Sequence, residues 1–158
     1  MTRSLVATAV VLLAACNQNG SPTAPFLDKS VTGDFTASIS KSSIVAGDTA
    51  TLHFALKNTG TDTLRMQFTS GCPILPYVQK APNGSIVYPE GGNWSCAAGT
   101  FELVLAPGAQ HEVTVLVHAG TPAPANFSGA ALPSGSYGAY ALLTNGKGRT
   151  NTVAFTTQ

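Results

Sequence analysis

Hydrophobic and polar residues alternate along most of the chain that follows the N-terminal segment, and no long stretch keeps the spacing of an amphipathic helix. Within residues 49–58, Leu52, Phe54 and Leu56 fall on one side of an extended chain, while polar or small residues fall on the other. Residues 63–69 repeat the pattern. Because successive side chains of a strand point to opposite faces, each segment predicts a strand with one face in a core.

Residues 58–62 lie between these two segments and include Asn58 and Gly60, residue types that turns favour because they tolerate positive φ. We therefore expect the two strands to form a connected antiparallel pair. Further short strands, separated by turn residues, are predicted at residues 34–40, 77–80, 86–88, 101–105, 111–118, 135–144 and 151–157. This spacing predicts an all-β fold, an immunoglobulin-like antiparallel β-sandwich of about eight strands, with a closed barrel as the alternative.

The start of the chain has the layout of a secretory signal segment. Arg3 gives a positive start, residues 5–13 form an apolar stretch, and small residues lead to Cys16. The stretch is shorter than the roughly 20 residues needed to cross a bilayer. A buried helix of the folded domain is the alternative, but it would leave the positive start and the polar residues that follow unexplained.

Leu13, Ala14, Ala15 and Cys16 resemble the lipobox of bacterial lipoproteins at every position. In that family the cysteine thiol receives a diacylglycerol, the signal is cut just before it, and the new amine is usually acylated. The resemblance implies that Cys16 is a lipid anchor, since stable anchoring takes two or more chains. Asn17 stands where some Gram-negative lipoproteins carry an inner-membrane retention Asp, which favours the outer membrane. The domain would then lie in the periplasm or at the cell surface.

The chain accordingly divides into a signal peptide at residues 1–15, a lipidated cysteine with a flexible polar tether at 16–32, and a β-sandwich at 33–158. Removing the signal peptide takes Arg3 away and leaves seven basic and seven acidic side chains. Nothing in that balance attracts phosphate backbones or an anionic membrane surface. We therefore expect the membrane to be a partner through the lipid anchor, and nucleic acid not to be a partner.

Cys72 and Cys96 are the cysteines that follow the proposed anchor. In an oxidising compartment an even pair predicts one disulfide, which closes a loop of about 24 residues and contributes roughly 3 kcal/mol. Two reduced buried thiols are the alternative. A metal site would need ligands at suitable spacing, which His53, His111 and His118 do not supply. We expect no metal and no cofactor.

Catalysis requires titratable groups that converge in one place. The sequence has no Gly-x-Ser-x-Gly motif, so it does not signal the strained turn that exposes a nucleophilic serine. Glu90, Glu102 and Glu112 fall in turn or solvent-facing contexts. The sequence therefore predicts that the protein is not an enzyme.

Residues 44–144 resemble the BsuPI-type intracellular proteinase inhibitor domain. Its successive elements match Asn58 and Thr59 (Asn-Thr turn), residues 68–71 (Phe-Thr/Ser-Gly), Asn83 and Gly84 (β-turn), residues 105–108 (Leu-x-Pro-Gly), and residues 132–137 (Leu-Pro-x-Gly-x-Tyr). The chain departs from that family in its export signal and in the two cysteines of the domain. The resemblance implies a β-sandwich and an inhibitory binding function.

Two loops are candidate binding segments, and the expected disulfide joins them. One contains Pro73, Ile74, Leu75 and Pro76, and the other contains Trp94. Prolines would hold the aliphatic side chains in a pre-ordered segment, which lowers the entropy cost of binding a serine protease, and tryptophan is a favoured interface anchor. Alternatively, these side chains cap the core against the disulfide. The sequence thus predicts a noncatalytic, lipid-anchored binding domain, either a proteinase inhibitor or a structural module that contacts another envelope protein.

Overall fold

The computed structural model of the protein describes residues 25–158, so the signal segment and Cys16 lie outside the described part. Apart from one 3₁₀ turn, Glu90–Gly92, the regular elements of this part are strands. The predicted all-β class is therefore confirmed. Within residues 25–158, no helix is long and apolar enough to cross a membrane.

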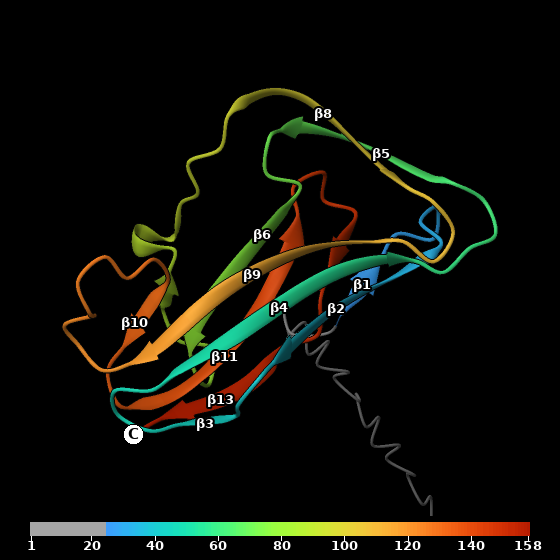
Figure 1. The fold of residues 1–158 in the computed structure, drawn as a ribbon. Coiled ribbons are helices and arrows are strands. Elements are labelled where there is room, and N and C mark those ends of the chain that lie inside the picture. Colours follow the sequence, from blue (N-terminus) through green and yellow to red (C-terminus); the bar gives the residue numbers. More distant parts are fainter. Residues whose placement is uncertain (1–24) are drawn as a thin grey trace, which may run out of the picture.

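The strands form three sheets (Figure 1). The seven-stranded sheet contains β1 (Phe26–Leu27), β12 (Gly148–Arg149), β11 (Gly135–Leu143), β13 (Val153–Thr157) and β3 (Ser43–Ile44), with β6 (Ile74–Lys80) pairing with β11 and with β7 (Ile86–Tyr88). The four-stranded sheet has the order β10 (Ala130–Leu132), β9 (Gln110–Ala119), β4 (Thr49–Asn58) and β2 (Gly33–Ile39). The third sheet is a two-stranded ribbon of β5 (Leu64–Ser70) and β8 (Ala98–Leu105).

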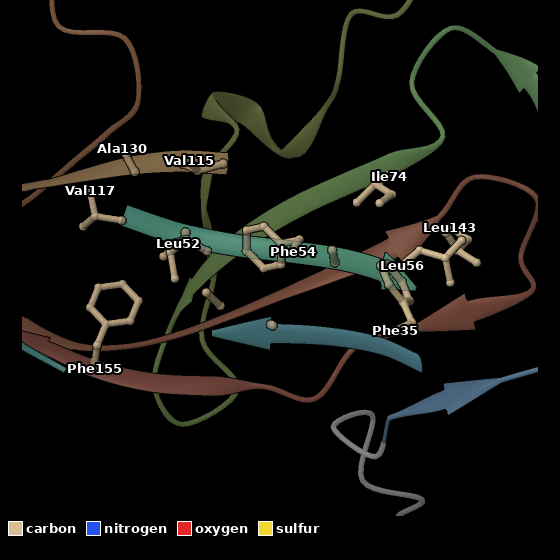
Figure 2. Close-up of a cluster of buried hydrophobic side chains, with 14 of the residues drawn as sticks. Phe35, Leu52, Phe54, Leu56, Ile74, Val115, Val117, Ala130, Leu143 and Phe155 are labelled. Atoms are coloured by element: carbon tan, nitrogen blue, oxygen red, sulfur yellow. The ribbon is translucent and has the colours of Figure 1, made fainter. Parts of the chain in front are cut away.

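The two larger sheets enclose one hydrophobic core. In Figure 1 the four-stranded sheet lies in front of the seven-stranded sheet, and the ribbon extends above both. The inward residues of β4, Leu52, Phe54 and Leu56, are completely buried. They lie between the sheets with Leu143 of β11 and Phe155 of β13 (Figure 2). Each such side chain contributes about 1.5–3 kcal/mol by leaving water, so this alternating pattern is the main local reason for the fold.

Two pairings differ from the antiparallel sandwich expected from the sequence. β10 pairs with β9 in parallel, and β3 pairs with β13 in parallel. Both β10 and β3 stand at the edge of their sheets, and both are short. They extend the sheets without changing the antiparallel pairing of the long strands.

The predicted pairing of β4 with β5 is wrong. β4 pairs with β2 and β9, whereas β5 pairs with β8. Lys57 at the end of β4 lies opposite Gln110 of β9, and Leu64 at the start of β5 lies opposite Leu105 of β8. The chain that runs from β4 into β5 therefore lies beside the chain that runs from β8 into β9 on both sides of a bend. β4 pairs with β9 on one side of the bend, and β5 pairs with β8 on the other. Residues 58–62 lead the chain from one ladder into the next and do not fold it back on itself.

Asn58 holds this bend from inside, and its side chain is 1% exposed. Its side-chain nitrogen donates to the carbonyl oxygens of Asp62 and Leu105, at 2.8 and 2.9 Å. Its side-chain oxygen accepts from the N–H of Gly60 at 2.9 Å. Its main-chain N–H and C=O bond to residues 108–109, both at 2.9 Å. A fully bonded buried amide thus fixes both chain segments of the bend.

The folded domain begins earlier than predicted. Phe26 of β1 pairs with Arg149 of β12, and Leu27 pairs with Gly148. Val31 is buried in the core. A side chain at Gly148 would approach Leu27 to 2.8 Å, so the missing side chain makes room for this pairing. The described residues that precede β2 therefore belong to the domain and not to a flexible tether.

We expect Asn58→Ala to lower the free energy of unfolding by roughly 3 kcal/mol, because the substitution leaves buried main-chain groups without their side-chain partners. Asn58→Asp should be nearly as destabilising, because a carboxylate cannot donate to two carbonyl oxygens. Chemical denaturation followed by far-ultraviolet circular dichroism measures both changes.

The matched control is Asn145→Ala, which removes two exposed hydrogen bonds, one donated to the carbonyl of Gln67 at 3.3 Å and one accepted from the N–H of Lys147 at 3.1 Å. This variant should change the free energy of unfolding by less than about 0.5 kcal/mol. Equal losses at the two asparagines would contradict the role of Asn58 at the bend.

Candidate functional site

The segment expected to be a binding loop is the start of strand β6. β6 pairs with β11 along its whole length. Ile74 is 3% exposed and belongs to the core, and Pro73 and Pro76 are buried as well. Leu75 is half-buried and points to the outer side of the sheet. The segment is therefore not a free loop, because its main chain is held by a strand far away in the sequence.

The side chain of Trp94 caps a main-chain carbonyl of β6. Its Nε1–H donates to the carbonyl of Pro76 at 3.0 Å, and its ring meets Tyr88 edge-on with centroids 5.5 Å apart. Cys72 and Cys96 are joined in a disulfide, the pair expected from the sequence, and this bond ties the start of β6 to the segment that carries Trp94. The alternative reading of Trp94, as a cap beside the disulfide, fits this arrangement.

A different group of side chains gathers on the outer face of the seven-stranded sheet. Residues directly opposite each other on antiparallel strands point to the same face. One such row crosses β1, β12, β11 and β6, and a pair of tyrosines lies beside it. We call this set the aromatic face, and it consists of Phe26, Leu75, Tyr77, Tyr140, Leu142 and Arg149.

The centre of the aromatic face is a three-part stack. Tyr77 and Tyr140 stack across β6 and β11 with ring centroids 5.5 Å apart and an interplanar angle of 25°. The guanidinium of Arg149 lies over the Tyr140 ring, 3.8 Å from its centroid. Such a contact contributes about 0.5–2 kcal/mol and holds the cation in place. Tyr140 is thereby only 8% exposed, whereas Phe26, opposite Arg149, is 53% exposed.

Arg149 keeps unused hydrogen-bonding capacity. Its Nε is buried and has no hydrogen-bond partner among the described residues. No carboxylate of residues 25–158 lies within ion-pair distance of it. Burial lowers the pKa of Arg149, and the nearby Tyr140 opposes that change, but a guanidinium stays charged at neutral pH. A charged guanidinium with free donors can bind a carboxylate or a phosphate group.

Tyr77 remains protonated at neutral pH, because burial, together with the neighbouring Tyr140, raises the pKa of its hydroxyl. The stack therefore carries a single positive charge at Arg149, next to the exposed ring of Phe26. The aromatic face combines a fixed cation with aromatic and aliphatic surface. It can hold an anionic group that has apolar surroundings.

The outer faces of the two larger sheets differ in charge. None of the residues in the strands of the seven-stranded sheet is acidic. The four-stranded sheet carries Asp34, Lys57 and the pair formed by His53 and Glu112, whose Nδ1 and Oε1 atoms lie 2.6 Å apart. The strands without an acidic residue are therefore also those that carry the aromatic face.

Of these residues, only Leu75 was a candidate from the sequence. A signal was present in β11, where Tyr137 and Ala139 face the core while Tyr140 and Leu142 face outward. A strand that is apolar on both sides usually has both sides covered. The other members could not be grouped from sequence, because they come from strands whose pairing was unknown.

The three histidines do not form a site. His53 contacts Glu112 near the surface, and His118 is buried beside the ring of Phe127, with centroids 5.6 Å apart. Burial lowers the pKa of His111. Residues 25–158 contain no group of three or more His, Cys, Asp or Glu side chains that could hold a metal ion.

No protein-family model and no curated protein matches this chain. Among solved structures, the chain is similar to the alkylpurine DNA glycosylase AlkC of Pseudomonas fluorescens bound to DNA, with 17% identity over 81% of this chain and 31% of that chain and a TM-score of 0.43. For the β-glucosidase EmGH1 of Erythrobacter marinus the identity is 13% over 80% of this chain and 16% of that chain, with a TM-score of 0.43.

A CARDB domain from Pyrococcus furiosus is 13% identical over 80% of this chain and 96% of that chain, with a TM-score of 0.40. The chain spans less than a third of the glycosylase and less than a fifth of the glucosidase. At these identities and TM-scores, the similarities carry no argument about activity.

We expect Ile74→Ala to cost about 3 kcal/mol of unfolding free energy, because it opens a cavity in the core, and Leu75→Ala to cost less than about 1 kcal/mol. Thermal and chemical unfolding of the two variants measure this difference between neighbouring residues. If both variants were as stable as the wild type, the segment would be a free loop and not part of β6.

Proposed function

We propose that this chain is an exported lipoprotein, anchored at Cys16, whose β domain is noncatalytic and makes its contacts through the aromatic face. The observation that carries the contact role is the stack of Arg149 on Tyr140, beside the exposed ring of Phe26. Aromatic residues and arginine are enriched at interaction surfaces, and exposed apolar patches often mark them. The acid-free strands around the stack give this surface a charge preference.

The lipid anchor is supported by the sequence Leu13, Ala14, Ala15 and Cys16 and by the apolar stretch before it. Only a short segment separates Cys16 from Phe26, the first residue of β1. At about 3.5 Å per residue, a segment of this length reaches at most roughly 35 Å. Lipidation at Cys16 would therefore keep the β domain close to the membrane surface.

The noncatalytic part of the proposal is supported by the distribution of titratable groups. His53 and Glu112 form a partly exposed pair on the outer face of the four-stranded sheet, and two further ion pairs of residues 25–158, Lys41 with Asp48 and Arg65 with Glu102, are also exposed. Catalytic groups instead converge around a site where a reacting atom can sit. These pairs are therefore better explained as surface contacts.

Proteinase inhibition through residues 73–76 is not part of the proposal. An inhibitory loop presents its main chain and one prominent side chain to the protease cleft, whereas the main chain of β6 is paired with β11. Ile74 is buried, so Leu75 is the aliphatic residue of this segment with an accessible side chain. The arrangement therefore favours an interaction module of the cell envelope over an inhibitor.

Cys16→Ser is expected to abolish membrane attachment, because the substituted chain offers no thiol for lipid transfer at that position. We would express both forms in a Gram-negative host and separate soluble and membrane fractions. Mass spectrometry of the wild-type N-terminus should show a lipid-modified Cys16. A wild-type protein that is unmodified at Cys16 and recovered in the soluble fraction would refute the anchoring proposal.

Stoichiometric titration against subtilisin-like, trypsin-like and elastase-like serine proteases should leave their activity unchanged. The reason is that the main chain of residues 74–80 is held in the sheet and cannot enter a protease cleft. Tight inhibition that Leu75→Asp weakens, without loss of the folded structure, would contradict this prediction and restore the inhibitor hypothesis.

A further inference from the structure

We propose that the aromatic face lies against the phospholipid headgroups of the membrane that holds the Cys16 anchor. Arg149 would bind headgroup phosphate, and the ring of Phe26 would enter the interfacial layer. The inference rests on the proposed function, since it requires the anchor at Cys16. The aromatic face is then the side of the domain that meets the membrane, and headgroup phosphate is the group that it binds.

The place where the chain enters the fold supports this orientation. The tether leads directly into β1, and Phe26 of β1 is itself a member of the aromatic face. The short segment after Cys16 limits the distance between this face and the bilayer to roughly 35 Å. Because the anchor makes the second contact intramolecular, even a weak surface interaction is populated at the resulting effective concentration.

The distribution of charge supports the same side. The mature chain as a whole is balanced, and the sequence therefore predicted no attraction to an anionic membrane surface. The fold separates these charges, because Arg149 lies on the outer face of the seven-stranded sheet and the strands of this sheet carry no acidic residue. The four-stranded sheet carries Asp34 and Glu112, which phosphate would repel. The outer face of the seven-stranded sheet is thus the better suited of the two to phospholipid, with Asp34 of β2 standing at the cavity beside Arg149.

The chemistry of the aromatic face fits the interfacial layer of a bilayer. Tyrosine sits at headgroup depth because it has an apolar body and a polar tip, and guanidinium groups bind phosphate through several donors. A shallow cavity of about 380 Å³ opens beside Arg149 and is lined also by Phe26, Asn151 and Asp34. Asp34 lies on the wall of this cavity and forms no ion pair with Arg149.

The test uses the full lipidated protein, reconstituted in vesicles of phosphatidylcholine and phosphatidylglycerol. Hydroxyl-radical labelling with mass spectrometry measures the oxidation rates of Phe26 and Tyr77. Leu116 and Val104 are internal references, because they are 42% and 45% exposed on other surfaces of the domain. The mature chain with Cys16→Ser, free in solution, gives the rates without a membrane. We expect Phe26 and Tyr77 to be oxidised several-fold more slowly on vesicles, with Leu116 and Val104 unchanged.

Two variants test the residues that carry the argument. Phe26→Ser, combined with Arg149→Gln, should stay on the vesicles through Cys16 and lose the protection of Tyr77. Phe26→Ser alone should lose part of the protection of Tyr77. This variant changes only an exposed side chain, so the fold is retained. The matched control combines Leu116→Ser with Lys57→Gln on the four-stranded sheet and should leave the protection intact.

Vesicle flotation distinguishes a failure of the anchor at Cys16 from a failure of the aromatic face to dock on the membrane. If the wild-type protein does not float with vesicles, the anchor proposal itself fails. If it floats and Phe26 and Tyr77 are oxidised at their solution rates, the anchor stands and the docking of the aromatic face is overturned. Protection that develops only after another envelope protein is added would also overturn it, in favour of a protein partner.

Discussion

The buried amide of Asn58 is the constraint on which the arrangement of the long strands depends. Three hydrogen bonds of this side chain and two of the main chain of Asn58 join the end of β4 to the turn that follows it, to the end of β8 and to residues 108–109. The same two stretches of chain pair before the bend as β4 and β9 and after it as β5 and β8. Because a shift of one residue would turn every side chain to the other face, one fixed corner sets the register of both ladders.

At two places a side chain caps main-chain groups at the edge of a strand. Asn151 bonds both the N–H and the C=O of Ala37 on β2, at 2.8 and 3.0 Å, as a neighbouring strand would. Trp94 bonds the carbonyl of Pro76 on β6. Capped edges do not recruit further strands. The aromatic face, by contrast, presents rings and a guanidinium without a covering element among the described residues.

The two outer faces of the domain thus have different physical roles. The face of the four-stranded sheet carries hydroxyl groups and polar side chains that bond locally, such as His53 with Glu112, and water solvates it well. The seven-stranded sheet places Arg149 on a tyrosine stack and has no acidic residue within its strands. A chain with nearly balanced charges therefore acquires a cationic, aromatic face through its fold, although its composition gives no indication of one.

Local pattern was sufficient to predict the all-β class, the bounds of strands such as Thr49–Asn58 and the pairing of Cys72 with Cys96, because alternation and cysteine parity are properties of short segments. It was not sufficient to predict which strand pairs with which. For this reason residues 73–76 and the pairing of β4 with β5 were misassigned, and Phe26 was placed in the tether. The aromatic face joins residues from four strands spread along the chain, and only long-range pairing, set by the shared core, brings them together.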